Sequence, residues 1–525
     1  MLGVEKEQGN VEYKLMLLSS DPRSLEHIAT QMRYRLTEGG GEAFYELGVS
    51  DEGESIGLTD DELKTSLDVL GKAAEVIGAK HSVVRVGEAP RGKVAEVLVR
   101  LCKEGSFPVY LMVPVLGNVD SGKSSLISVL CSGMLDDGNG LAMTRVARFL
   151  HEIKMRRTSS ISTHLLGYSG DGGVVNYNLL APLDEAGVFL HSAKVVSFVD
   201  LGGHERYLRT TLKGVMGRAP DYVVLIVGAN AGIVGTTREH LGVAVALRIP
   251  VFVVVTKVDM VGGEQVTHVL EDIETILKFP GVNKIPITVK SQDDVVVAAR
   301  NMVTNRVTPI FLVSNINGYG LNLLRDFLNL LPPRLRWEEK FAEPFLMYVD
   351  DKFNVKGVGT VVNGVILQGS IGVDDLVQIG PFEDGSARVV RVRSIHVNRV
   401  SVSKAFSGQD VCLALANIEY GEVAKGMCVL DKNVKMKPIR FFEARVTVLH
   451  HPTTIWHGYN AVAHIHTVRQ AVEFMEMSEE PLRTGVTATV KFGFKFKPEY
   501  VRDADWFVFR EGRTRGIGVI TKILS

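Results

Sequence analysis

The segment Gly-Asn-Val-Asp-Ser-Gly-Lys-Ser, residues 117–124, follows directly on an apolar run from 109 to 116. The spacing of Gly117, Gly122, Lys123 and Ser124 is typical of a phosphate-binding loop between a buried strand and a helix. The glycines let backbone N–H groups turn toward phosphate oxygens, the lysine reaches the β and γ phosphates, and the serine hydroxyl binds Mg²⁺. The segment therefore predicts a strand, a nucleotide phosphate site and a helix that starts near residue 125.

A second apolar segment, Val195–Val199, ends in Asp200-Leu201-Gly202-Gly203. A buried strand would deliver the Asp200 carboxylate to its carboxyl end, where it can hold Mg²⁺ while the Gly203 N–H binds the γ-phosphate. His204 comes next. A lone histidine is more often structural, but directly after a phosphate-sensing glycine it can orient the attacking water. His204 is the predicted catalytic residue.

A third apolar segment, Val251–Val255, ends in Thr256-Lys257-Val258-Asp259. The Asp259 carboxylate can accept two hydrogen bonds from guanine N1–H and N2–H₂, which adenine lacks, so it selects GTP over ATP. The Lys257 stem can pack along the base. A fourth segment, Pro309–Val313, leads to residues 314–316, whose backbone N–H groups are expected at guanine O6. The predicted nucleotide is GTP.

These motifs define the predicted site. The nucleotide-binding residues are Gly117, Asn118, Val119, Asp120, Ser121, Gly122, Lys123, Ser124, Ser125, Asp200, Gly203, Thr256, Lys257, Asp259, Ser314, Asn315 and Ile316.

The chain has 525 residues, which is too long for a single core, and its patterns divide it into four parts. Residues 1–107 predict a small α+β module with its helices on one side of the sheet. Residues 108–333 alternate buried strands with helices, the pattern of a doubly wound, mostly parallel α/β domain. Residues 334–434 and 435–525 carry short strands between turns and predict two β-barrels.

Within the N-terminal module the expected elements alternate. Strands are predicted at Tyr13–Leu18, Ala43–Val49 and Ser82–Val86, and helices at Arg23–Arg35, from Thr59, and at Arg91–Leu101. Thr59 and Glu62 have the spacing of a helix capping box. The module carries no recognisable chemistry, so an interaction or scaffolding role is preferred.

Composition narrows the class of protein. The four cysteines are scattered, which argues against a zinc ribbon or a disulfide framework and fits a reducing cytoplasm. The net charge of −1 predicts no uniformly basic surface and no DNA partner. The N-terminus is polar and the apolar runs are too short to span a bilayer, so no membrane association is expected. The basic run at 154–157 reads as a solvated face or a nucleic-acid contact.

Five histidines crowd into one short span of the last predicted barrel. They are His450, His451, His457, His464 and His466. His464 and His466 are expected to point to one strand face. No cysteine or acidic residue completes a ligand set, so barrel packing or RNA contact is preferred over a metal site.

The sequence resembles the translational GTPase superfamily of elongation factor Tu. Residues 117–124 resemble its phosphate loop, Asp200–His204 its Asp-x-Pro-Gly-His motif, and Thr256–Asp259 its Asn-Lys-x-Asp motif. Residues 509–518 resemble its last barrel strands. The loop, the 157–160 segment and the His451-Pro452-Thr453-Thr454 stretch are most similar to the GTP-binding protein 1 and 2 branch, and the likeness covers nearly the whole chain.

This resemblance implies Mg²⁺ held by Ser124, Asp200 and a switch-one hydroxyl, which would be Ser160 with Thr158 as the alternative. It also implies a monovalent cation near Asp120 and places the water-positioning role on His204. There are departures. Gly202 replaces a proline and Thr256 replaces an asparagine, but the Thr256 hydroxyl should still tether the loops.

The implied function is a GTP-hydrolysing switch in cytoplasmic translation, which cycles between GTP and GDP and engages ribosomes and aminoacyl-tRNA. The alternative is a GTP-gated adaptor that links ribosomes or mRNA to RNA-decay factors. The N-terminal module, which elongation factor Tu lacks, favours the alternative.

Overall fold

The computed structural model describes residues 4–102, 107–147, 149, 152, 161–201, 217–512 and 514–524. The chain forms two compact units. The first comprises residues 1–200, 221–241 and 250–335, and the second comprises residues 201–220, 242–249 and 336–525. Each unit is described by itself.

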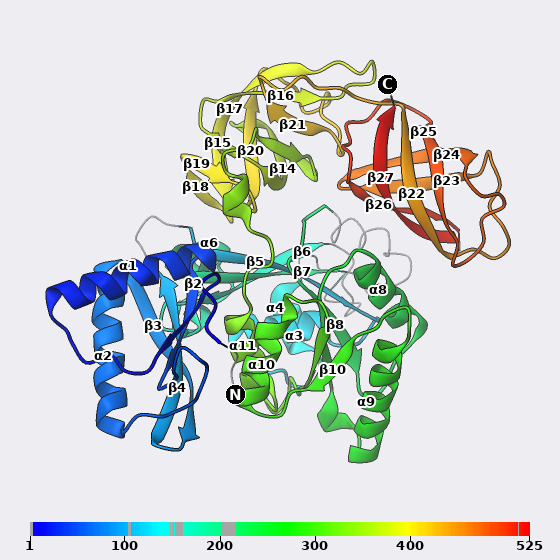
Figure 1. The fold of residues 1–525 in the computed structure, drawn as a ribbon. Coiled ribbons are helices and arrows are strands. Elements are labelled where there is room, and N and C mark those ends of the chain that lie inside the picture. The colour runs from blue at the N-terminus through cyan, green and yellow to red at the C-terminus, as the bar shows by residue number, and fades with distance from the viewer. Residues whose placement is uncertain are drawn as a thin grey trace. The chain divides into compact units, whose positions relative to one another are not determined.

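The N-terminal module is a four-stranded sheet in the order β1-β2-β4-β3, covered by α1 and α2. Its elements are β1 (Val11–Lys14), α1 (Pro22–Glu38), β2 (Glu42–Leu47), α2 (Asp60–Val76), β3 (Ala79–Ala89) and β4 (Gly92–Leu101). Met32 of α1 and Leu70 of α2 share a core with Tyr45 and Val97 of the sheet, so both helices lie on one face, as predicted (Figure 1). The capping box of Thr59 and Glu62 is also present.

The helix predicted at Arg91–Leu101 is wrong, because Gly92–Leu101 is strand β4. It pairs antiparallel with β2 and β3 and is buried on both faces: Val97 packs under the helices, while Leu98 joins the core of the next domain. A strand covered on both sides loses the two-residue alternation, so its apolar spacing also fits a helix.

The next domain has a seven-stranded sheet in the order β10-β11-β9-β8-β5-β7-β6, parallel except for β6, which pairs antiparallel with β7. Its strands are β5 (Val109–Gly117), β6 (Ser162–Tyr168), β7 (Lys194–Asp200), β8 (Val223–Gly228), β9 (Val251–Thr256), β10 (Ile285–Thr288) and β11 (Val307–Leu312). Its α-helices are α3 (Lys123–Ser132), α4 (Leu141–Val146), α6 (Glu185–His191), α8 (Gly235–Ala246), α9 (Gly263–Lys278), α10 (Gln292–Met302) and α11 (Leu321–Leu330). Short 3₁₀ turns are η1 (Val175–Asn178) and η3 (Val258–Met260).

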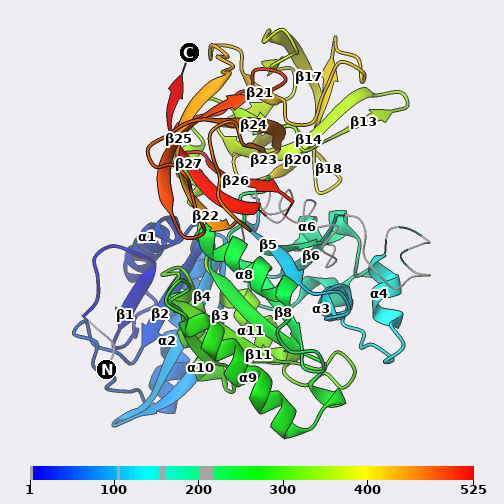
Figure 2. The ribbon, with the colours of Figure 1, turned by 90° about the vertical axis from the view of Figure 1, so that its right-hand side faces the viewer.

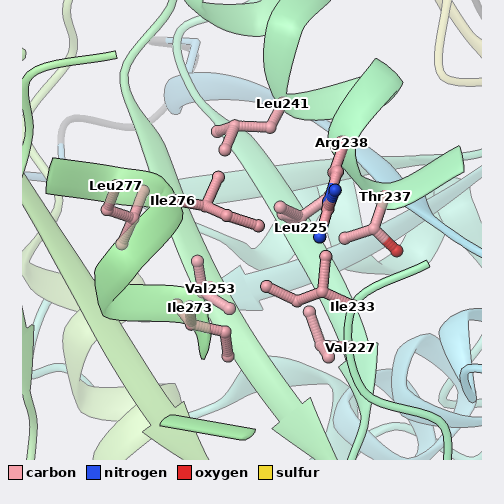
Figure 3. A pocket seen from close by; sticks show the side chains of 10 residues that line it. All are labelled: Leu225, Val227, Ile233, Thr237, Arg238, Leu241, Val253, Ile273, Ile276 and Leu277. Carbon is pink, nitrogen blue, oxygen red and sulfur yellow. The ribbon is translucent and has the colours of Figure 1, made fainter. Parts of the chain in front are cut away.

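Helices cover both faces of this sheet, as the doubly wound prediction required. Phe252 of β9 packs on Phe327 of α11, with ring centroids 5.2 Å apart. The next residue, Val253, faces the opposite side, where α8 and α9 lie next to each other (Figure 2). There it lines a small apolar pocket with Leu241 and Ile273 (Figure 3). The central strands are buried on both faces, which explains their continuous apolar sequences.

The second unit contains the two predicted β-barrels, and each is closed by six strands. The first barrel consists of β12 (Leu346–Tyr348), β21 (Cys428–Asp431), β16 (Leu376–Gly380), β17 (Arg388–Val397), β20 (Asp410–Ala416) and β14 (Gly359–Gln368), and β12 pairs with β14 to close it. Its accessory strands are β13 (Asp351–Val355), β15 (Ser370–Gly372), β18 (Val400–Val402) and β19 (Lys404–Phe406), and η4 (Trp337–Lys340) precedes it. The second barrel consists of β22 (Phe441–His450), β25 (Thr487–Phe494), β24 (Val468–Met477), β23 (Asn460–Ile465), β26 (Trp506–Glu511) and β27 (Thr514–Leu524).

The expectation that His464 and His466 point to one strand face is wrong. His464 is a buried residue of β23, but His466 lies beyond the strand with φ of 50°, so the two do not share a strand face. His466 Nε2 lies 2.9 Å from Asp505 Oδ1 and its ring stacks on Tyr348. Within the described residues no group of three or more histidine, cysteine, aspartate or glutamate side chains could hold a metal ion, and none of the four cysteines forms a disulfide.

Across the described ranges, the structure has no helix of the length and apolarity that a membrane span requires.

Candidate functional site

The phosphate loop joins β5 to α3 and depends on backbone conformations that favour glycine. Gly117 has φ of 147°, and a Cβ there would lie 2.5 Å from the Ile226 carbonyl oxygen of β8. Gly122 has φ of 85° and is the N-cap of α3. Asp120 adopts φ of 58°, the left-handed region that aspartate tolerates better than most residues. The loop therefore curls in front of the α3 N-terminus, whose first N–H groups favour an anion.

Lys123 lies inside this loop. Its Nζ donates to the Asn118 carbonyl oxygen at 2.6 Å and to the Gly117 carbonyl oxygen at 3.3 Å. Burial lowers the pKa of Lys123 to about 8, and Asp200 and Asp120 oppose that shift. The ammonium is thus desolvated, and its hydrogen bonds within the described residues go to carbonyl oxygens, an arrangement that gains strongly from a negatively charged ligand.

Ser124 and Asp200 converge from α3 and β7. The Ser124 Oγ donates to Asp200 Oδ2 at 2.6 Å, and both side chains are buried. A hydroxyl and a carboxylate so close together offer the hard oxygen ligands that Mg²⁺ prefers. The two residues therefore fit the predicted Mg²⁺ site.

Two residues of α8 that the sequence motifs do not include also hold the loop. The buried His240 accepts a hydrogen bond at Nδ1 from the Gly117 N–H at 3.1 Å, and Thr236 donates to Asn118 Oδ1 at 2.9 Å. Burial and the nearby Lys123 lower the pKa of His240 to about 4, so the ring is neutral and its Nδ1 stays an acceptor. Contacts from a neighbouring helix leave no motif in the sequence, which is why these residues were missed.

The base-side motif follows β9. The buried Thr256 donates its hydroxyl proton to the Ser121 carbonyl oxygen at 2.6 Å, which is the tether expected between this strand and the phosphate loop. Lys257 adopts φ of 62° and turns the chain into η3, where Asp259 is exposed. The Asp259 carboxylate is therefore accessible to a ligand.

The loop after β11 is fixed from inside by Ser314. Its Oγ accepts from the N–H groups of Ile316 and Asn317, both at 3.2 Å, and its own N–H donates to the Tyr319 carbonyl oxygen at 3.0 Å. Of the three residues predicted to face guanine O6, only Asn315 has an N–H without an acceptor in the described part of the chain.

Gly203, His204 and Ser160 with its alternative Thr158 lie outside the described residues, as does the basic run at 154–157. Their roles stay predictions. The described elements nevertheless bring the phosphate loop, Asp200, Thr256 and the 314–316 loop to the carboxyl ends of neighbouring parallel strands, the usual ligand position in this class of sheet.

Comparison with known proteins gives a match to a domain family and matches to whole proteins. The family model for the elongation factor Tu GTP binding domain matches residues 109–334. GTP-binding protein 1 of Xenopus laevis is 41% identical over 98% of this chain and 79% of its own length, and GTP-binding protein 2 of Mus musculus is 41% identical over 99% and 88%. Elongation factor 1-alpha of Methanopyrus kandleri is 26% identical over 79% of this chain and 98% of its own length.

Solved structures agree on the fold. The translation elongation factor SelB from Methanococcus maripaludis, in complex with the GTP analogue GppNHp, superposes with a TM-score of 0.57 at 18% identity and covers 80% of each chain. A bacterial selenocysteine-specific elongation factor gives a TM-score of 0.58 at 21% identity over 78% of this chain and 58% of its own. The loop geometry, the family match and the near-complete coverage agree, and the chain belongs to the translational GTPase superfamily, in the branch of GTP-binding proteins 1 and 2.

Proposed function

We propose that this protein hydrolyses GTP to GDP and acts as a conformational switch in translation. The observation that supports it best is the convergence of the buried Lys123, the Ser124–Asp200 pair and the exposed Asp259 carboxylate at one edge of the sheet. Together they match the charge of a triphosphate, the ligand preference of Mg²⁺ and the donor pair of guanine.

In this proposal the phosphates lie in the loop of residues 117–125, with Lys123 as their cationic partner. Ser124 and Asp200 hold Mg²⁺, with Ser160 or Thr158 from switch one. When bound there, Mg²⁺ would neutralise charge that develops on the phosphates during transfer. Asp120 is the proposed neighbour of a monovalent cation. Gly203 binds the γ-phosphate and His204 orients the attacking water.

The base is read from two sides. Asp259 accepts from guanine N1–H and N2–H₂, and Lys257 packs along the ring. The Asn315 N–H donates to guanine O6, because its two neighbours in the loop use their own N–H groups on Tyr319 and Ser314. GTP is therefore preferred to ATP.

GTP and GDP would hold the switch segments differently, and the barrels would present an RNA- or ribosome-facing surface that responds to the nucleotide. The proposed partners are ribosomes and aminoacyl-tRNA. The names of the relatives that are elongation factors favour this assignment. Cytoplasmic translation is the proposed setting.

The deciding experiment measures GTP turnover alone, with ribosomes, and with ribosomes plus charged tRNA. Slow intrinsic turnover and stimulation by ribosomes are expected. The His204→Ala variant should bind GTP with unchanged affinity and lose the stimulation. Full stimulated turnover in that variant would remove His204 from the mechanism, and no stimulation under any condition would count against the translation role.

A second candidate is a GTP-gated adaptor that couples ribosomes or mRNA to RNA decay. The N-terminal module supports it, since the module lies before residues 109–334, which match the family model for the elongation factor Tu GTP binding domain. Purification of the GTP-bound form separates the candidates: recovery of aminoacyl-tRNA favours the first, and recovery of RNA-decay factors favours the adaptor.

A further inference from the structure

Asn315 has a buried side chain that uses none of its hydrogen-bonding capacity on the described protein. The residue is 8% exposed, and its Oδ1 is buried without a partner. Its Nδ2 donates to no described residue either. Buried side-chain amides usually bond to protein or to ordered water, so an amide that bonds to neither in the described chain needs an explanation, and a bound ligand that takes up its free N–H groups is one.

The position of this amide points to the nucleotide. Its Nδ2 lies 3.7 Å from the point that a Cβ on Gly122 would occupy, and Thr256 Oγ1 lies 3.5 Å from the same point. Asn315 and Thr256 thus flank the second glycine of the phosphate loop, where the loop enters α3. The Asn315 amide therefore reaches from the loop of residues 314–316 to the phosphate loop.

Thr256 cannot serve the base from this place. A hydroxyl has one proton to donate, and that proton is committed to the Ser121 carbonyl oxygen at 2.6 Å. The amide of Asn315 has two N–H donors and uses neither within the described protein. Of Thr256 and Asn315, only Asn315 therefore has an uncommitted N–H or O–H donor for the base.

We propose that the Asn315 side chain donates an N–H to N7 of the bound guanine nucleotide, a contact that Thr256 cannot make while its hydroxyl proton is committed to Ser121. Guanine presents N7 and O6 as acceptors along one edge, and the Asn315 backbone N–H is already assigned to O6. One residue then covers both acceptors, while Asp259 covers the opposite edge. The inference rests on the proposed binding of GTP. Because adenine also has N7, this contact adds affinity, and base selection stays with Asp259.

The test uses GDP and 7-deaza-GDP, in which a C–H group replaces N7. Dissociation constants are measured for the full chain and for Asn315→Ala, with Asn322→Ala, an exposed amide on α11, as the matched control. The unaltered chain should bind 7-deaza-GDP about 3- to 10-fold more weakly than GDP, the size of one neutral hydrogen bond. Asn315→Ala should lose a similar factor for GDP and bind both nucleotides equally, whereas Asn322→Ala should keep the discrimination.

Equal binding of the two nucleotides by the unaltered chain overturns this inference and leaves the proposed function standing. Discrimination that survives in Asn315→Ala also overturns it. If the unaltered chain binds neither nucleotide, the proposed function fails and the inference fails with it. The comparison on the unaltered chain needs no variant, so it tests the inference even if Asn315→Ala does not fold.

Discussion

At the residue scale, the phosphate loop is held by neighbours as much as by its own glycines. His240 and Thr236 are four residues apart on α8, so they lie on one helix face, and each binds one of the first two loop residues. Thr256 fixes the loop from β9. Hydrogen bonds from α8 and β9 therefore fix the conformation of the loop, which favours a nucleotide site that is formed before the ligand binds.

A buried neutral histidine makes stability depend on pH. The pKa of His240 is lowered to about 4, so the unfolded chain binds more protons than the folded one between about pH 6.5 and 4. The free energy of unfolding should therefore fall as pH drops through this window, by up to about 3 kcal/mol. His240→Asn keeps an acceptor but does not titrate, so it should remove this part of the slope.

The unfolding transition that contains the nucleotide site is identified by its shift when GDP is added. Its midpoint is then measured at several pH values between 7.5 and 4. His268→Asn, which replaces an exposed histidine of α9, should leave the slope unchanged. An unchanged slope in His240→Asn would show that another group carries the acid sensitivity.

Asp259 carries the base preference in the proposed site. Asp259→Asn exchanges an acceptor-only group for one with a donor, so it should lower guanine nucleotide affinity about 100-fold and favour the xanthosine nucleotide. Competition binding of GDP against xanthosine diphosphate checks it. A variant that keeps its guanine preference would contradict the assignment of Asp259.

At the scale of elements, three strands of the nucleotide domain could be predicted because each ends in a motif. Residues 109–116, 195–199 and 251–255 were expected as strands, and β5, β7 and β9 include all of them. Gly92–Leu101 has no such motif, and burial on both faces hides its alternation, so its helix prediction failed. The contacts from α8 could not be predicted, since a helix that faces a loop backbone needs no fixed residue spacing.

Strand pairing in the last barrel places aromatic rings over glycines. Phe509 of β26 pairs with Gly516 of β27, and a Cβ on Gly516 would lie 1.9 Å from Phe509 Cζ. Gly516→Ala should therefore lower the free energy of unfolding by about 1–3 kcal/mol through overpacking. Chemical denaturation checks it, with Lys522→Ala, an exposed position on the same strand, as the control. Equal stability of the two variants would mean that the ring moves aside at no cost.

At the scale of the whole molecule, the N-terminal module and the nucleotide domain share one buried ion cluster. Glu42 of β2 accepts from Arg100 Nε at 2.7 Å and lies 3.0 Å from Lys194 Nζ, and all three side chains are 0–1% exposed. Burial would raise the pKa of Glu42, but Lys194 and Arg100 outweigh it, so the pKa is lowered and the carboxylate is charged. Lys194 begins β7, the strand that ends at Asp200, so the module anchors the strand that carries a proposed Mg²⁺ ligand.

We expect this cluster to make the module and the nucleotide domain unfold as one cooperative unit. Glu42→Ala would leave Arg100 and Lys194 buried without their anion, so it should cost about 3–5 kcal/mol of unfolding free energy. The matched control is Asp293→Ala, which breaks the ion pair between Asp293 and Arg85. Because the Asp293 side chain is 75% exposed, this substitution should cost at most about 1 kcal/mol of unfolding free energy. Denaturation followed both by GDP release and by loss of secondary structure should give coincident transitions, and Glu42→Ala should shift both together. If the unaltered chain loses the module in a separate transition while GDP stays bound, the module is an independent domain. A shared core and a shared buried charge cluster would not unfold in parts.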